Sequence, residues 1–125
     1  MSDGRRVLLV DDEDDIRSIA ELSLRALGGW DVRTAASGVE ALGATRDDAF
    51  DVIVLDVMMP ELDGPSTLRR LREDGVQTPV VFLTAKVQPT DRRALEEAGA
   101  AGMLAKPFDP MRLSDELARV LEEAA

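Results

Sequence analysis

The sequence predicts an α/β fold in which a parallel, five-stranded sheet is covered by helices on both faces. Three short apolar runs, Val7–Val10, Val52–Leu55 and Val80–Leu83, are rich in Val, Ile and Leu, as strands buried on both faces usually are. Amphipathic helical patterns separate these runs. Strand and helix alternate five times, and the strands begin roughly 20–28 residues apart, which is the length of βα units.

Two weaker segments complete the predicted sheet. The segment Asp31–Ala35 alternates polar and apolar residues, as a half-exposed strand does. The segment Gly102–Ala105 is rich in Ala and Gly, which are poor strand formers. We therefore expect these two strands at the edges of the sheet and the three apolar strands in its middle.

The helices are marked by apolar spacing and by start and stop signals. Gly28-Gly29 ends the first helix, Ser37 and Glu40 form a capping box for the second, and Asp109-Pro110 starts the fifth as N-cap and first-turn Pro. The apolar positions are Ile16, Ala20, Leu24 and Leu27; Val39 and Leu42; Leu68 and Leu71 after Gly64-Pro65; Ala94, Leu95 and Ala98 before Gly99; and Leu113, Leu117, Val120 and Leu121.

Length and composition narrow the class of protein. A chain of 125 residues suits one domain, so we expect a single domain over residues 1–125. The net charge of −10 argues against binding to nucleic acid or to an anionic membrane. The sequence contains neither a membrane-spanning apolar run nor a secretory signal pattern, so we expect a cytoplasmic protein.

The chain contains no Cys and no His. It therefore has no disulfide, thiol nucleophile, imidazole base or common zinc ligand set. Any chemistry has to use carboxylates, hydroxyls, Lys, Arg, backbone groups or a hard cation.

Polar residues follow the ends of four predicted strands. They are Asp11-Asp12, Asp56, Thr84 and Lys106. The carboxyl ends of parallel strands lie at one edge of a sheet, and α/β proteins bind ligands there, where the strand order reverses. Each residue alone has a structural explanation, such as a helix start, a turn or a solvated surface. Their common position at one edge favours a shared site.

The residue types at this edge suit phosphoryl transfer. Three carboxylates close together repel one another, and Mg²⁺, which prefers carboxylate, carbonyl and water oxygens, would offset that repulsion. Lys106 adds a positive charge, and the Thr84 hydroxyl can donate to an anionic oxygen. A metal, an ammonium group and a hydroxyl around a carboxylate are what transfer of a phosphoryl group onto that carboxylate requires.

These residues, with their neighbours, resemble a known family. The motifs are Asp11-Asp12, Asp56 followed by Met59-Pro60 and Asp63-Gly64, Thr84-Ala85, and Lys106-Pro107-Phe108. In this order and spacing they resemble the receiver domain of bacterial two-component response regulators, over essentially the whole chain. The resemblance implies a CheY-like, stand-alone receiver with the doubly wound, flavodoxin-like fold and the strand order 2-1-3-4-5.

The resemblance also implies a role for each site residue. Asp56 would accept a phosphoryl group, and Mg²⁺, or Mn²⁺ as a substitute, would be held by Asp11, Asp12, Asp56 and the Met58 backbone carbonyl. Thr84, followed by Ala85, would move toward the phosphate, Lys106 would pair with its oxygens, and the Lys106–Pro107 bond would be cis. Such a protein catalyses only its own phosphorylation and slow dephosphorylation, and is not a metabolic enzyme.

Partners follow from the same resemblance. The phosphodonor would be a histidine kinase or a histidine phosphotransfer protein, and the output a contact with a downstream protein, from a monomer or a weak, phosphorylation-dependent dimer. The positions that match the family's docking surface are Ile16, Ile19, Pro107 and Phe108. Ordinary core packing explains these four residues equally well.

The sequence departs from the family at a switch position. Receivers usually have Tyr or Phe three residues before the Lys, where this chain has the flexible Met103. We therefore expect a looser response to phosphorylation at the fourth and fifth helices. Met58 and Lys86 match positions at the site entrance, and we hypothesise that apolar Met58 hinders attack by water and prolongs the phosphorylated state.

Two alternatives use related chemistry. Haloacid dehalogenase-type phosphatases also form an aspartyl phosphate, but they need a general-acid Asp two residues after the nucleophile, where this chain has Met58. A receiver-like scaffold that acts without phosphorylation could lose the acceptor or the acid pair, whereas both are retained here. The sequence favours the phosphorylated receiver.

Overall fold

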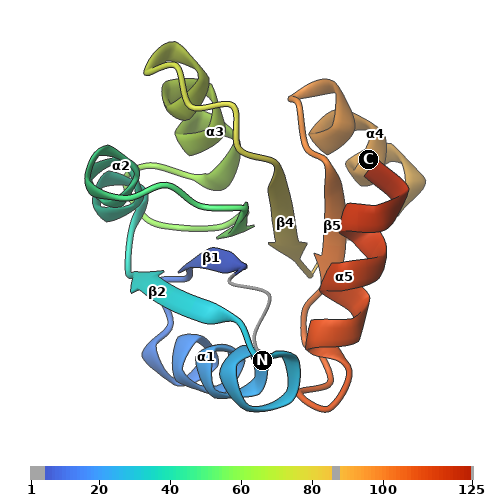
Figure 1. Cartoon of the computed structure of the whole chain (residues 1–125). Helices are drawn as coiled ribbons and strands as arrows, with labels where there is room; N and C mark the ends of the chain where they lie inside the picture. The colour runs from blue at the N-terminus through green and yellow to red at the C-terminus, as the bar shows by residue number, and fades with distance from the viewer. Residues whose placement is uncertain (1–4, 86–87, 125) are drawn as a thin grey trace.

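The computed structural model describes residues 5–85 and 88–124. Strands and helices alternate along the chain (Figure 1). The elements are β1 (Arg6–Val10), α1 (Asp14–Gly28), β2 (Asp31–Ala35), α2 (Gly38–Asp47), β3 (Val52–Asp56), α3 (Gly64–Glu73), β4 (Val80–Thr84), α4 (Pro89–Glu97), β5 (Gly102–Ala105) and α5 (Leu113–Ala124). The expected α/β alternation is confirmed.

The five strands form one parallel sheet in the order β2-β1-β3-β4-β5. The three apolar strands lie in the middle and the two weaker strands at the edges, as predicted. The order reverses at β1 and β3, where Val10 pairs with Leu55. The ends of these two strands therefore lie side by side, with the loops that follow them diverging to opposite faces.

Successive strand residues enter two separate hydrophobic cores. Leu8, Ile53 and Phe82 pack with α2, α3 and α4 on one face of the sheet. Leu9, Val54 and Leu83 pack with α1 and α5 on the other. Figure 1 shows α1 and α5 on the same side of the sheet, where they contact each other. The three-layer arrangement follows from the period-2 alternation of strands and from one apolar stripe per helix.

Most predicted helix signals are present. Gly29 adopts the left-handed conformation that ends α1, at φ 67°, and the Ser37 hydroxyl accepts a hydrogen bond from Glu40 N at 3.1 Å. Some apolar positions assigned to helix faces are exposed instead. Leu27 and Val39 point to solvent, and of the three residues that marked α4 only Leu95 is buried.

The start of α5 differs from the expectation. Asp109 caps a turn rather than the helix: its carboxylate accepts from Met111 N at 2.9 Å, and α5 begins at Leu113. The Ser23 hydroxyl of α1 donates a hydrogen bond to the Pro110 carbonyl oxygen. The turn is thus contacted by a distant element, and a local N-cap signal carries no information about such a contact.

Among residues 5–85 and 88–124, no helix has both the length and the apolar composition needed to cross a lipid bilayer.

Candidate functional site

The predicted site residues meet at the carboxyl edge of the sheet. Asp11 and Asp12 directly follow β1, Asp56 is the last residue of β3, and Thr84 is the last residue of β4. Lys106 directly follows β5, and its backbone N–H donates to the Thr84 carbonyl oxygen at 2.9 Å. Parallel pairing thus brings residues that are far apart in sequence to one edge.

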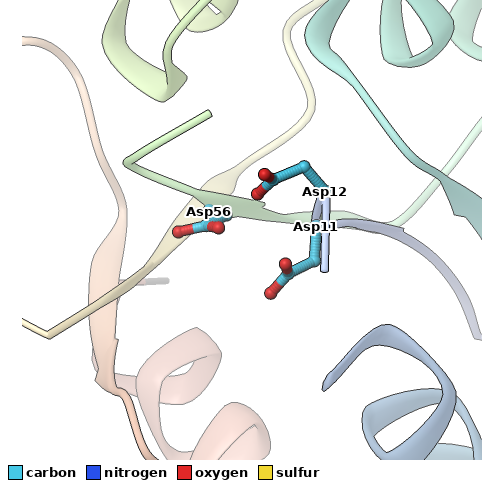
Figure 2. A group of neighbouring side chains, drawn as sticks. All are labelled: Asp11, Asp12 and Asp56. Atoms are coloured by element: carbon cyan, nitrogen blue, oxygen red, sulfur yellow. The ribbon is translucent and has the colours of Figure 1, made fainter. Parts of the chain in front are cut away.

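Three carboxylates gather around one point of this edge. Asp11, Asp12 and Asp56 each offer an oxygen within 4.8 Å of the others, and Figure 2 shows the three side chains together where β1 and β3 end. Asp11 and Asp56 are buried, whereas Asp12 is partly exposed. The group therefore combines two desolvated carboxylates with one that faces the solvent.

Lys106 is the cation that faces this group. Its Nζ lies 3.0 Å from Asp11 Oδ2 and 3.1 Å from Asp56 Oδ2. A third contact, 3.1 Å to Glu13 Oε1, was not anticipated from the sequence. The peptide bond from Lys106 to Pro107 is cis. Among the described residues, Lys106 thus pairs with three carboxylates at once.

Burial and hydrogen bonding shift the pKa values of Asp56 and Lys106. Burial raises the pKa of Asp56 to about 6, an effect that the negative charge of Asp11 reinforces and the hydrogen bond from Lys106 opposes. Burial lowers the pKa of Lys106, but hydrogen bonds to Asp11, Glu13 and Asp56 outweigh it and leave that pKa above its usual range. One ammonium therefore does not neutralise the carboxylates around it.

The loop after β3 is held close to Asp56. Met58 N donates to Asp56 Oδ1 at 3.3 Å, and Gly64 N donates to the Val57 carbonyl oxygen at 2.9 Å. A Cβ on Gly64 would lie 2.6 Å from the Asp56 carbonyl oxygen, so only glycine permits this approach. The Asp63 carboxylate then caps α3 by accepting from Ser66 N at 2.8 Å. The motif Asp63-Gly64 fixes the backbone that carries Asp56.

The loop after β1 is held by Asp11 and Arg17. Glu13 N donates to Asp11 Oδ1 at 2.9 Å, and Arg17 Nη1 donates to the Asp11 carbonyl oxygen at 2.8 Å. Arg17 also pairs with Asp14 at 2.6 Å. Sequence reasoning missed the roles of Glu13 and Arg17. The only available signal was their position in the charged run that opens α1, and such runs are common at helix starts.

The remaining predicted residues differ in their exposure to solvent. Thr84 is buried and Ala85 is exposed beside it. Met58 has an exposed side chain at the edge of the site, and Met103 is half-buried on β5. Lys86 lies outside the described residues. The four candidate docking residues differ in exposure: Ile19 and Pro107 are exposed, whereas Ile16 and Phe108 are partly buried. Phe108 also packs against the core formed with α1 and α5, so core packing accounts for part of its environment.

The donor set at this edge fits a hard divalent cation. The carboxylate oxygens lie within 4.8 Å of one another, close enough for one divalent cation to be shared among them. Two of the three acids are buried and share one ammonium, so an additional positive charge would relieve their repulsion.

Comparison with known proteins identifies the family. The response regulator receiver domain matches residues 7–118. The chain is 40% identical over 120 residues to the transcriptional regulatory protein TrcR of Mycobacterium tuberculosis, covering 96% of this chain and 46% of that protein. It is 36% identical over 121 residues to the alkaline phosphatase synthesis transcriptional regulatory protein PhoP of Bacillus subtilis, covering 97% of this chain and 50% of PhoP. The chain thus spans about half the length of these relatives.

Similarity to solved structures supports the same family. The chemotaxis response regulator CheY4 of Vibrio cholerae superimposes with a TM-score of 0.87 at 37% identity, covering 94% of this chain and 98% of CheY4. The BeF₃-activated receiver domain of DrrB gives a TM-score of 0.79 at 31% identity, covering 95% of this chain and 98% of that domain. With its fold, its site and these similarities in agreement, the chain belongs to the response regulator receiver family.

Proposed function

We propose that this chain is a receiver that takes a phosphoryl group on Asp56 and thereby switches a protein–protein contact. The observation that carries the proposal is the buried Asp56 carboxylate, 3.1 Å from Lys106 and grouped with Asp11 and Asp12. Family membership supports it. We further propose that residues 1–125 act as one receiver domain in the cytoplasm.

Mg²⁺ is the proposed cofactor, with Mn²⁺ as a substitute. Asp11, Asp12, Asp56 and the Met58 carbonyl would hold it, and when bound it would neutralise charge on the transferring phosphoryl group. The chain's own contribution is the arrangement of acids that attracts the cation. The raised pKa of Asp56, to about 6, leaves the acceptor mostly ionised at neutral pH and therefore competent as a nucleophile.

In the proposed transfer, an Asp56 carboxylate oxygen attacks the phosphorus of a phosphohistidine. A P–O bond forms, the N–P bond breaks, and its electron pair returns to the imidazole nitrogen. Lys106 then pairs with phosphoryl oxygens, and the Thr84 hydroxyl donates to another. In dephosphorylation, water attacks the phosphorus and the bond between phosphorus and the Asp56 oxygen breaks. Inorganic phosphate leaves, a proton of the water is released to solvent, and the Asp56 carboxylate is restored.

The proposed phosphodonor is a histidine kinase or a histidine phosphotransfer protein. Ile16, Ile19, Pro107 and Phe108 would form part of the surface that it contacts, because all four are at least partly exposed and Pro107 and Phe108 directly follow Lys106 in the chain. The output would be a contact with a downstream protein at the surface of α4 and α5, to which Thr84 and Met103 would transmit phosphorylation of Asp56.

The experiment is incubation with a small acyl phosphate and Mg²⁺, followed by intact mass spectrometry. We expect an adduct of one phosphoryl group that is lost on chelation and never forms in Asp56→Asn. Asp51→Asn is a matched control, because Asp51 lies just before the amino end of the same strand and bonds Arg6 N at 2.6 Å. An adduct that persists in Asp56→Asn, or its absence in the unmodified chain, would contradict the proposal.

A further inference from the structure

Glu13 occupies the N-cap position of α1, but its side chain does not cap the helix. N-cap positions favour Ser, Thr, Asp and Asn, whose short side chains reach the backbone N–H groups two or three residues on. Within the described residues, the Glu13 side chain makes no capping hydrogen bond. Its carboxylate instead lies 3.1 Å from Lys106 Nζ. The Glu13 side chain therefore points toward Lys106 in the site and not toward the backbone of α1.

The contact with Glu13 completes the hydrogen bonding of Lys106. An ammonium group has three N–H donors. In the described part of the chain, three carboxylates lie at 3.0–3.1 Å from Lys106 Nζ: Asp11, Glu13 and Asp56. Phosphorylation turns the Asp56 carboxylate into an acyl phosphate and so frees one of these donors. A second phosphoryl oxygen can receive a full hydrogen bond from Lys106 only when Asp11 or Glu13 gives up its own.

The three carboxylates differ in how easily they can be released. The side chains of Asp11 and Asp56 are 0% and 5% exposed, whereas that of Glu13 is 59% exposed. A buried carboxylate that loses its partner stays desolvated, while an exposed one regains hydrogen bonds from water. Asp11 is further fixed by Glu13 N, which donates to its other oxygen. Glu13 is therefore the partner with the smallest cost of release.

We propose that Glu13 is a positioning residue that holds Lys106 in the unphosphorylated protein and gives up its place to an incoming phosphoryl group. Its release is then part of the cost of forming the phosphorylated state. This inference rests on the proposed function, since it needs Asp56 to be the acceptor. It assigns the exposed acid at the start of α1 a role in setting how readily the receiver is phosphorylated.

The equilibrium test uses beryllofluoride, a mimic of the phosphoryl group, at saturating Mg²⁺. The variant is Glu13→Gln, and the matched control is Asp15→Asn, which removes one charge from the same acidic run at an exposed residue of α1. We expect Glu13→Gln to lower the half-saturating beryllofluoride concentration about two- to fivefold below that of Asp15→Asn, the range expected for a partly exposed ion pair.

A second readout needs neither metal nor phosphoryl mimic. The ¹⁵N-bound hydrogens of the Lys106 ammonium, assigned through Lys106→Arg, exchange slowly with water while three carboxylates hold them. In the metal-free protein we expect faster exchange in Glu13→Gln and unchanged exchange in Asp15→Asn. A role confined to starting α1 would not produce this difference.

The outcomes separate this inference from the proposed function. If the unmodified chain forms no adduct on Asp56, the proposed function fails and this inference fails with it. If the adduct forms but Glu13→Gln matches Asp15→Asn in beryllofluoride affinity or in ammonium exchange, this inference alone is overturned. Tighter beryllofluoride binding together with faster exchange, both specific to Glu13→Gln, supports it.

Discussion

The acidic residues at the two ends of the sheet differ in their burial and in their pairing with cationic side chains. At the amino end, Arg6 lies 3.0 Å from Asp31 and 3.1 Å from Asp48, and Arg33 lies 2.6 Å from Asp48. These side chains are all partly exposed. At the carboxyl end, by contrast, two fully or nearly buried aspartates depend on one lysine.

The pKa values move in opposite directions at the two ends. The hydrogen bond from Arg33, aided by the charge of Arg6, lowers the pKa of Asp48. Burial raises the pKa of Asp56 to about 6. The fold therefore favours the ionised form of Asp48 at the amino end and opposes the ionised form of Asp56 at the carboxyl end. The amino end is arranged for stability, whereas the carboxyl end retains negative charge that suits the binding of a cation.

The largest expected effect is a gain of stability in Asp56→Asn without Mg²⁺. The folded-state pKa of Asp56, about 6, lies above its ordinary 3.8, so its ionisation opposes folding. Ionisation of Asp56 should therefore lower wild-type stability by up to about 3 kcal/mol as pH rises from about 4 to about 7, and Asp56→Asn should lack this contribution. Urea unfolding of both proteins at several pH values measures this. A variant less stable than wild type at pH 8 would refute it.

A smaller effect is stabilisation by Mg²⁺. For a dissociation constant near 1 mM, 10 mM Mg²⁺ should raise the free energy of unfolding by about 1.4 kcal/mol. The acid variant Asp12→Asn should respond much less, because it lacks one of the grouped carboxylates. Urea unfolding at constant ionic strength measures the difference, with Asp48→Asn as the control. Equal responses in all three proteins would show that the cation acts elsewhere.

At the entrance of the carboxyl end, Met58→Asn should speed dephosphorylation. The Met58 side chain is 72% exposed beside the acceptor loop, and we expect its apolar surface to hinder the attacking water. The measurement is decay of the phosphorylated protein after the phosphodonor is removed. An equal or slower decay in the variant would rule out this role of Met58.

We expect Met103 to influence how phosphorylation at the carboxyl end of the sheet changes the surface of α4 and α5. Met103 lies on β5 beside β4, in register with Phe82, and is half-buried. Met103→Tyr should sharpen the phosphorylation-dependent change at α4 and α5, because a ring has fewer rotamers than Met. Amide NMR shifts of the two helices, with and without beryllofluoride, report the change. Spectra that respond as in wild type would count against it.

The smallest expected effect is at the amino end, in Asp48→Asn. Because the pKa of Asp48 is lowered, its contribution to stability is present above its ordinary pKa of 3.8 and is lost as pH falls through the lower folded value. We expect a modest loss of stability at pH 7 that disappears in acid and shrinks with added salt. Urea unfolding in low and high salt provides the measurement. A loss of stability in Asp48→Asn that increases as the pH is lowered would contradict this prediction.

Much of this arrangement could be predicted from the sequence, for identifiable reasons. Strands such as Val52–Asp56 are nearly all apolar, and parallel pairing sends their carboxyl ends to one edge whatever the details of the loops. That rule predicts from the sequence alone that Asp11, Asp56 and Lys106 meet at this edge. The edge positions of β2 and β5 followed from composition in the same way.

What the sequence did not predict depends on contacts between distant segments. The turn before α5 is contacted by Ser23, whose hydrogen bond to the Pro110 carbonyl oxygen no local pattern encodes. The contact from Glu13 to Lys106 depends on the reach of a long side chain across 93 residues of sequence. Val39 has an apolar side chain in a helix, yet it is exposed, since apolar residues also occur on protein surfaces.

The central claim is that the buried acid at the end of β3 is the residue that accepts the phosphoryl group. The most direct measurement is borohydride reduction of the protein after treatment with an acyl phosphate and Mg²⁺, followed by peptide mapping. An aspartyl phosphate is reduced to homoserine, so we expect homoserine at position 56 only when Mg²⁺ is present. Homoserine at Asp11, Asp12 or Glu13 instead, or at no position despite a stable phosphoryl adduct, would contradict it.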